Sequence, residues 1–199
     1  MCASIAGIAC QEPQKAEPPV VTKARPEEKR ALGYFRLVAG TSYLMAPISS
    51  KSKGEYGYES DKDAHNYVFF NTEDESTQTL LPHNDHLFVA TVSLPEKREG
   101  DKEASAAKWF LYGLVKSDTD GDRELTYKDR RSLYVSDAGG AGFKEVVTDV
   151  EHVYGHSLHN ADTLILIYRR GSKKYVMRVY LPNREVVSTN ELPTFGVDE

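Results

Sequence analysis

Short runs of β-branched and aromatic residues follow one another along the chain from Leu32 onward. Clusters of Asp, Asn, Gly and Pro separate these runs, and no stretch shows the 3.6-residue apolar period of a long amphipathic helix. Such a pattern is typical of strands joined by tight turns, so we expect an all-β fold. The predicted strands are Tyr34–Val38, Tyr67–Phe70, Leu87–Val92, Trp109–Val115, Leu133–Val135, Leu164–Tyr168 and Tyr175–Tyr180.

Three stretches, 65–84, 131–149 and 173–190, share one pattern: an aromatic and aliphatic run, a polar turn, and a doublet of aliphatic residues. The doublets are Leu80–Leu81, Val146–Val147 and Val186–Val187. Each stretch predicts a hairpin, and preceding strands such as 108–116 would extend the hairpins into antiparallel meanders. The pattern resembles successive blades of a β-propeller. Three blades are too few to close, so we expect propeller-like blades, or a curved sheet or sandwich, and not a closed ring from one chain.

Both cysteines, Cys2 and Cys10, lie at the start of the chain, so the rest has no thiol for a disulfide or a thiolate metal site. The small apolar residues before Cys10 resemble the end of a bacterial lipoprotein signal peptide, in which Cys10 would accept the lipid. Gly7 stands where such signals usually carry Leu. The positively charged first region of a signal peptide and most of its apolar middle region are missing. The resemblance implies a lipid-anchored protein on the periplasmic side of the cell envelope. The alternative is an ordinary tail on a cytoplasmic protein.

The expected organisation has three parts. Residues 1–10 would be a truncated lipoprotein signal, and residues 11–30, which are rich in proline and charge, a disordered tether. Residues 31–199 would form a single β domain that contains an Asp-rich loop at 118–129.

The balance of charge limits the partners. Lys and Arg number 25 against 30 Asp and Glu, the net charge is −5, and no local run supplies a basic stripe. These features exclude a nucleic-acid binder that works by neutralising phosphates. No apolar stretch approaches the roughly 20 residues of a membrane-spanning helix, so membrane contact would come only through a lipid anchor. A protein, a glycan or a second copy of this chain remains as partner.

The acidic loop 118–129 is the one motif with a defined chemistry. Its residues can be aligned with a twelve-residue calcium loop, in which alternate oxygen ligands converge on one hard cation. The spacing therefore predicts a calcium site. The predicted ligands are Asp118, Asp120, Asp122, the carbonyl of Glu124, Thr126 and Asp129.

This loop resembles those of EF-hands and dockerins, with two departures. Arg123 stands where Gly normally makes the sharp turn, so either a side chain tolerates a positive φ or the turn differs. Asp129 replaces the longer, bidentate Glu. The preceding run is strand-like, which favours a structural ion between two strands over a helix–loop–helix sensor. The alternative is a solvated acidic turn in which the Asp residues only form turns.

Other polar groups carry weaker signals. The histidines, His83, His86, His152, His156 and His159, lack the helical context and the accompanying ligands of a zinc site, so we expect turn and surface residues. The segment 155–159 lacks the closing Gly and following helix of a nucleophile elbow. We assign no catalytic residue from the sequence.

We therefore expect a non-enzymatic, exported β-protein with a structural calcium loop and a role in binding or in the cell envelope. It resembles bacterial lipoproteins that combine propeller-like strands with a single Asp-rich loop, and no function comes with that resemblance. Two alternatives remain: a calcium-dependent hydrolase or carbohydrate-active accessory domain, and a β subunit completed by self-association.

Overall fold

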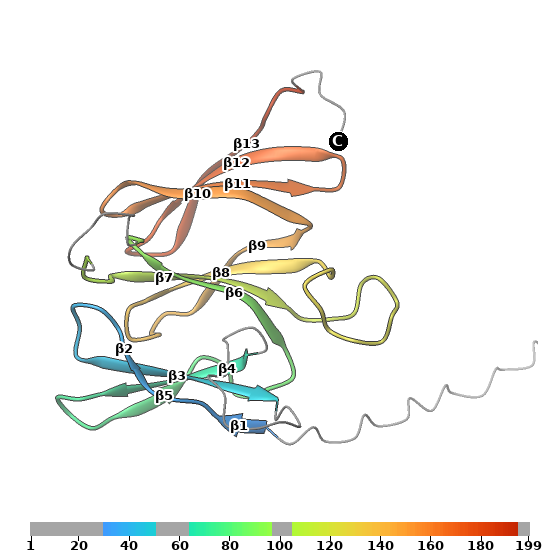
Figure 1. Ribbon diagram of the computed structural model, residues 1–199. Helices are drawn as coiled ribbons and strands as arrows, with labels where there is room; N and C mark the ends of the chain where they lie inside the picture. Colours follow the sequence, from blue (N-terminus) through green and yellow to red (C-terminus); the bar gives the residue numbers. More distant parts are fainter. Residues whose placement is uncertain (1–29, 51–63, 97–104, 195–199) are drawn as a thin grey trace, which may run out of the picture.

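The computed structural model describes residues 30–50, 64–96 and 105–194 (Figure 1). Within these ranges the chain forms strands and no helix, which confirms the all-β prediction. No described segment is therefore a helix of the length and apolar character that crossing a membrane requires. The strands are β1 (Arg30–Leu32), β2 (Arg36–Leu37), β3 (Tyr43–Ser50), β4 (Ala64–Asn71), β5 (Thr77–Thr79), β6 (Leu87–Leu94), β7 (Trp109–Val115), β8 (Arg131–Asp137), β9 (Lys144–Val150), β10 (His152–Asn160), β11 (Thr163–Arg170), β12 (Lys173–Tyr180) and β13 (Glu185–Glu191).

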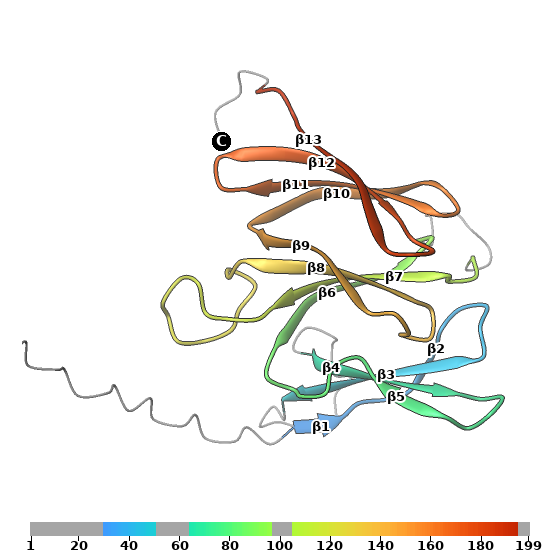
Figure 2. The same cartoon turned by 180° about the vertical axis from the view of Figure 1, so that it is seen from behind.

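The strands lie in three stacked layers, as both views show (Figures 1 and 2). We call β1–β5 the first layer, β6–β9 the middle layer and β10–β13 the last layer. The middle and last layers are four-stranded antiparallel meanders in which each strand pairs with the next. The layers follow one another like propeller blades, and the stack is open at both ends. The expected propeller-like arrangement without a closed ring is confirmed.

Few backbone hydrogen bonds join one layer to the next. The first and middle layers belong to one hydrogen-bonded sheet, in which Ala64 of β4 pairs with Phe88 of β6. Just before β7, the N–H of Ala107 also donates to the Ala39 carbonyl at 2.8 Å. The last layer is a separate four-stranded sheet. Side-chain packing, and not a continuous ladder, therefore holds the described layers together.

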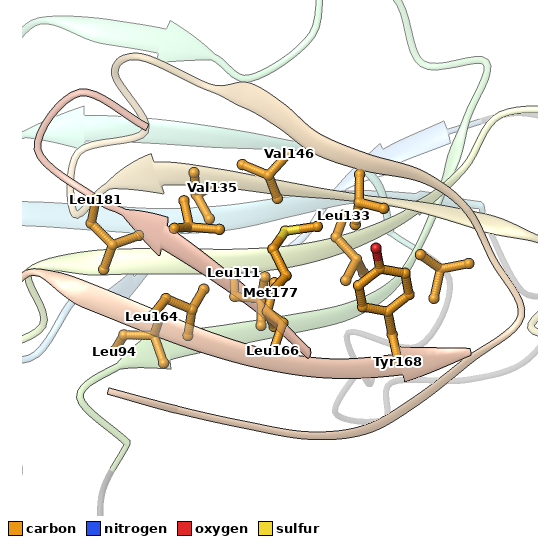
Figure 3. Close-up of a cluster of buried hydrophobic side chains, with 13 residues drawn as sticks. Leu94, Leu111, Leu133, Val135, Val146, Leu164, Leu166, Tyr168, Met177 and Leu181 are labelled. Carbon is orange, nitrogen blue, oxygen red and sulfur yellow. The ribbon is translucent and has the colours of Figure 1, made fainter. Parts of the chain in front are cut away.

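Two apolar cores fill the spaces between the layers. Along β7 the side chains alternate: Phe110 and Tyr112 enter the core against the first layer, and Leu111 enters the core against the last layer. Because both faces of β7 are covered, its sequence reads as a nearly continuous apolar run. A fully buried side chain of this size contributes about 1.5–3 kcal/mol. The core against the last layer is mainly aliphatic, with Tyr168 as its one fully buried ring, and includes Leu133, Val135, Leu164, Leu166, Met177 and Val179 (Figure 3).

The core between the first and middle layers is aromatic. The Tyr67 and Phe88 rings meet edge to face with centroids 5.1 Å apart, and Phe69 meets Phe110 at 6.0 Å. Tyr112 is fully buried, and its hydroxyl lies 2.9 Å from Ser136 Oγ. Burial raises the pKa of Tyr112 far above its ordinary value, so this hydroxyl keeps its proton. Edge-to-face pairs add about 0.5–1.5 kcal/mol each to the burial of their area.

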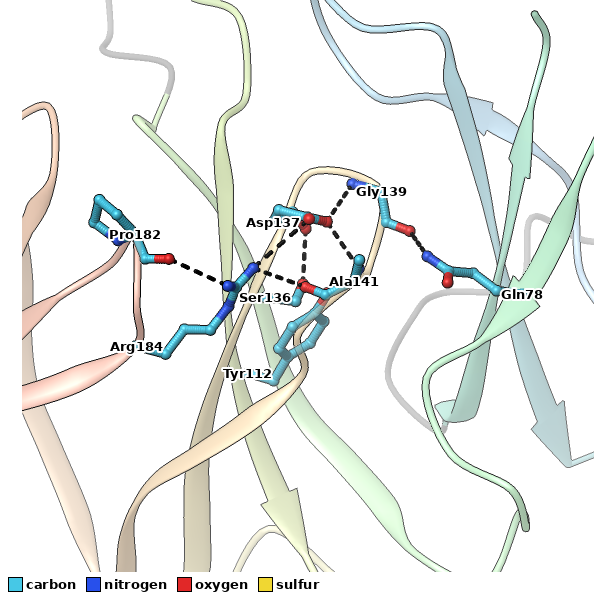
Figure 4. Close-up of polar contacts among 8 residues, drawn as sticks. All are labelled: Gln78, Tyr112, Ser136, Asp137, Gly139, Ala141, Pro182 and Arg184. Atoms are coloured by element: carbon cyan, nitrogen blue, oxygen red, sulfur yellow. Dashed lines mark hydrogen bonds and ion pairs between the residues drawn. The ribbon is translucent and has the colours of Figure 1, made fainter. Parts of the chain in front are cut away.

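The loop after β8 fastens all three layers at one rim (Figure 4). Asp137 Oδ1 accepts hydrogen bonds from the N–H groups of Gly139 and Ala141, at 3.0 and 2.8 Å, which fixes the loop. From the first layer, the Gln78 amide donates to the Gly139 carbonyl. From the last layer, Arg184 Nη2 donates to the Ala141 carbonyl at 3.0 Å and lies 3.6 Å from Asp137 Oδ2. The middle layer therefore holds both neighbours by polar contacts as well as by its cores.

The start of the domain differs from the prediction. Arg30, the last residue of the predicted tether 11–30, is the first residue of β1; the rest of the tether and residues 1–10 lie outside the described ranges. The single strand predicted over Tyr34–Val38 is wrong, since β1 and β2 are separate short strands and Tyr34 lies between them, 74% exposed. Both short strands pair with β3, and residues 33–35 between them belong to neither strand.

The sequence analysis missed two strands, and it placed the second arm of one hairpin a few residues from its observed position. The missed strand β3 contains Pro47 and several small residues, which are poor strand formers, but it pairs with β1 on one side and β4 on the other. The missed strand β10 carries Gly155 and three histidines, and pairing with β11 holds it in place. The predicted second arm at Leu80–Leu81 lies just past β5, where both residues pack on the aromatic core.

Exposed apolar side chains gather at the two ends of the stack. Among the described residues, every large apolar side chain that is strongly exposed belongs to an end layer, with the exception of Tyr127 in the acidic loop. The first layer exposes Leu32, Tyr34, Phe35 and Leu37, and the last layer exposes Tyr154, Tyr180, Val186 and Val187. The middle layer, which is covered on both faces, exposes none. The ends of the stack are thus less well covered than its centre.

Candidate metal centre

The acidic loop joins β7 to β8 and projects from one side of the middle layer (Figure 1, yellow-green). Strands flank it on both sides, as predicted, and only a short turn at Tyr127 and Lys128 precedes β8. The loop is therefore a long connection between two neighbouring antiparallel strands. Its conformation depends on its own side chains, because most of its residues are exposed.

Asp118 organises the first half of the loop. Its Oδ1 accepts a hydrogen bond from the N–H of Gly121 and its Oδ2 one from the N–H of Arg123, both at 2.6 Å. Arg123 adopts a φ of 71°, the left-handed conformation that glycine normally supplies at this position. A side chain in this conformation costs about 1 kcal/mol. Of the two outcomes expected for Arg123, the structure shows a positive φ at a residue with a side chain.

Asp129 organises the second half from a fully buried position. One carboxylate oxygen accepts from both the N–H and the hydroxyl of Thr119, at 2.5 and 3.0 Å, and the other accepts from the N–H of Thr126 at 2.9 Å. Burial raises the pKa of Asp129, but the hydrogen bonds from Thr119 and Thr126 outweigh it and leave the pKa below its ordinary value. Asp129 is therefore held as a charged carboxylate at neutral pH.

Sequence reasoning missed the part played by Thr119. Its hydroxyl donates to Asp129 and accepts a hydrogen bond from the N–H of Arg130 at 2.9 Å. Thr119 thus positions the buried carboxylate without being a candidate ligand itself. The available signal in the sequence was the Thr119 hydroxyl directly after Asp118. Because this position is not a ligand position of the calcium loop, the spacing gave Thr119 no role.

Three of the predicted ligands come together. One carboxylate oxygen from each of Asp118, Asp120 and Asp129 lies within 4.8 Å of the others, close enough for the three to share a metal ion. Asp122 lies outside this group, and its Oδ1 accepts from the N–H of Glu124 at 2.8 Å. Coordination by Asp122, by the Glu124 carbonyl and by Thr126 stays a prediction.

The flanking cations pair with acids on other segments. Lys116 Nζ donates to Glu145 Oε2 at 2.6 Å, and Arg130 Nη1 lies 3.1 Å from Asp149 Oδ1. These contacts direct both charges toward β9 and its end. The grouped carboxylates therefore repel one another, and a bound cation would relieve that repulsion.

The histidines show a different arrangement from the one predicted, but not a metal site. His152, His156 and His159 belong to strand β10 and not to a turn. His156 Nε2 contacts Glu96 Oε1 at 2.7 Å, and the His152 ring packs against Tyr154. Within residues 30–50, 64–96 and 105–194, no histidine belongs to a group of side chains that could hold a metal ion.

Comparison with known proteins adds little beyond the fold. No protein-family model matches the chain, and no curated protein matches it. One similar solved structure is the β-propeller domain of the Trilobed protease from Pyrococcus furiosus, which is described as having an open velcro topology. The two share 12% identity at a TM-score of 0.42, over 83% of this chain and 44% of the other. The chain thus spans less than half the length of that structure, and its all-β fold follows from its own strand pairing.

Proposed function

We propose that the chain is an exported β-protein with a binding role, in which the Asp118–Asp129 loop holds a structural calcium ion. The convergence of the Asp118, Asp120 and Asp129 carboxylates carries this proposal. Calcium accepts six to eight oxygen ligands at about 2.3–2.6 Å, in a flexible geometry that suits carboxylates, carbonyls and water. The loop offers these ligand types and no softer ones.

The backbone of the loop also has a shape that suits a calcium site. Asp118 accepts from the N–H groups three and five residues ahead, so the chain curls around its carboxylate. This curl brings Asp120 beside Asp129, which lies at the far end of the loop. In such a site the ion would tie the end of β7 to the start of β8 and offset the charge repulsion.

A pair of matched substitutions tests the proposal. Asp120 and Asp122 are both exposed, and each accepts a hydrogen bond from the N–H two residues ahead, at 3.2 and 2.8 Å. Asn keeps that acceptor and removes the charge, so Asp120→Asn and Asp122→Asn disturb the backbone equally. Only Asp120 belongs to the converging group.

The measurement is thermal unfolding of the full chain in calcium and in chelator. Calcium at about 100 times its dissociation constant should stabilise the wild-type protein by about 2.7 kcal/mol, or a few degrees. The shift should be lost in Asp120→Asn, and Asp122→Asn tests whether Asp122, which lies outside the converging group, is also a ligand as the spacing predicts. If millimolar calcium produces no shift in the wild-type protein, the loop is an acidic turn and the proposal fails.

Self-association is a second candidate function, favoured by the open ends of the stack. Leu32 and Leu37 on the first layer are 55% and 65% exposed, and a large contiguous patch of such residues marks a contact surface. Sedimentation of the full chain should show a dimer or larger species that Leu37→Asp dissociates. Tyr127→Asp is the control, because Tyr127 is 71% exposed but lies outside both end layers. A wild-type protein that sediments only as a monomer removes this function.

A protein or glycan partner and a lipid anchor at Cys10 complete the proposal. Cys10 lies outside the described residues, so its lipidation rests on the sequence resemblance alone. An anchored protein would present its partner surfaces on the periplasmic side of the envelope.

A further inference from the structure

A serine and a histidine meet away from the acidic loop, where three strands come together. Ser50 ends β3, His65 lies in β4, and Ser50 Oγ is 3.0 Å from His65 Nε2. His65 is 8% exposed, whereas Ser50 is partly open to solvent. The imidazole is thus largely covered, and Ser50 is the more open of the two residues.

A β-bulge aims His65 at this serine. In the pairing of β3 with β4, Ile48 lies opposite Asn66 and Ser49 lies opposite Ala64. His65 is therefore the extra residue of the bulge. Bulges are over-represented beside active sites, because the extra residue can point its side chain in a direction that a regular strand does not allow.

The second ring nitrogen determines the role of the first. His65 Nδ1 lies 2.6 Å from the carbonyl oxygen of His86, the residue before β6. A carbonyl oxygen can only accept, so Nδ1 carries the hydrogen. In the neutral ring, Nε2 is then an acceptor, and the Ser50 hydroxyl donates to it. This is the arrangement of a nucleophile, its base and a group that orients the base.

We propose that Ser50 is a nucleophile for acyl transfer from small esters, with His65 as its general base and the His86 carbonyl as a positioning group. The inference goes beyond the binding role proposed above and does not depend on the calcium loop. It gives the hydrolase alternative a defined site. Arg30 lies directly opposite Ser50 in the pairing of β1 with β3, so the neighbouring strand carries a cationic residue.

The reaction balances without an added oxidant or reductant. Ser50 Oγ attacks the ester carbonyl carbon while its proton passes to His65 Nε2. The bond from that carbon to the alcohol oxygen then breaks, and the departing alcohol takes the proton from Nε2, which leaves an acyl group on Ser50. Water attacks the acyl group by the same route and regenerates the free hydroxyl.

A fluorophosphonate probe tests the nucleophile directly in the full chain. Ser50 Oγ would form a bond to phosphorus, fluoride would leave, and His65 would take the proton. Intact mass and peptide mapping should then find one adduct, at Ser50. Ser157 is an internal control, because its hydroxyl donates to the Leu158 carbonyl at 3.4 Å in place of an imidazole.

Two variants separate a catalytic pair from a structural hydrogen bond. Ser50→Ala should abolish labelling, and His65→Gln should slow it by about 100-fold or more, the usual contribution of a general base. Thermal unfolding of each variant establishes that it is folded. If His65→Gln does not fold, the rate at Ser50 relative to Ser157 in the wild-type protein decides the question.

The proposal fails on either of two results. One is a folded wild-type protein in which Ser50 reacts no faster than Ser157. The other is a folded His65→Gln variant that is labelled as fast as the wild type. In both cases the Ser50–His65 contact would serve only to fasten β3 to β4.

Discussion

Replacing Asp129 by alanine should lower the free energy of unfolding by about 3 kcal/mol, even without calcium. The substitution removes the acceptor for two backbone N–H groups, those of Thr119 and Thr126, and for the Thr119 hydroxyl. A buried donor that loses its acceptor costs about 1–3 kcal/mol. Water that enters from the exposed side of the loop would replace part of the lost hydrogen bonding. We therefore take the low end of this range for each of the three donors, which gives about 3 kcal/mol in total.

Urea unfolding in the presence of chelator measures this loss, with an unchanged m-value as the sign of an unchanged two-state transition. Asp122→Ala is the control in the same loop. It removes one acceptor, from the exposed N–H of Glu124, and should cost less than about 1 kcal/mol. Equal losses in the two variants, or a loss below about 1 kcal/mol for Asp129→Ala, would refute the assignment of Asp129 as the organising residue.

The same carboxylate predicts the direction of a pH effect. The pKa of Asp129 is lower in the folded protein than its ordinary value of 3.8, so the folded state binds this proton less tightly. The stabilisation is therefore fully present above the ordinary value and is lost as the pH falls through the folded pKa. The stability difference between the wild-type protein and Asp129→Ala should narrow below about pH 4. A difference that stays constant down to pH 2 would contradict this account.

Three further predictions follow from single positions. Leu166→Ala empties a fully buried site between the middle and last layers and should cost about 2–5 kcal/mol in urea unfolding, whereas Ile165→Ala, on the opposite face of β11, should cost clearly less. Arg123→Gly should raise stability in chelator by up to about 1 kcal/mol by relieving the positive φ, and Arg123→Ala, which keeps the β-carbon, should not. Expression with the native upstream region in a bacterium should give a protein acylated at Cys10, and Cys10→Ser should abolish the lipid mass; an unmodified wild-type protein would remove the anchor.

The strands that sequence reasoning found are those with buried apolar faces. Trp109–Val115 is predicted at its observed bounds, because burial on both faces leaves an unbroken apolar run. Strand β3 has no such signal around Pro47, and its pairing with two neighbours is a tertiary effect. Alternation within one strand indicates which residues are buried, but not that another strand will supply hydrogen-bond partners.

Of the two candidate sites, the acidic loop could be predicted from the sequence and the Ser50–His65 pair could not. The acidic loop could be predicted because its ligands are close together in sequence, so local spacing determines much of their geometry. The Ser50–His65 pair could not, because it depends on a bulge in β4 and on a carbonyl at His86, before another strand. A histidine in an apolar strand gives no local signal of the hydroxyl that register places beside it.

The scarcity of backbone hydrogen bonds between layers has a consequence for how the protein opens. Because Ala64 and Phe88 are the only paired residues that link the described strands of one layer to the next, each layer behaves as a repeat in a short linear array coupled to its neighbours by side-chain packing. In such an array the ends fray and the centre is the last part to exchange its amide hydrogens. Strands β7 and β8, covered on both sides, should set the slowest exchange rates of the molecule. The end layers can therefore unfold locally while β7 and β8, the strands that anchor the acidic loop, stay folded.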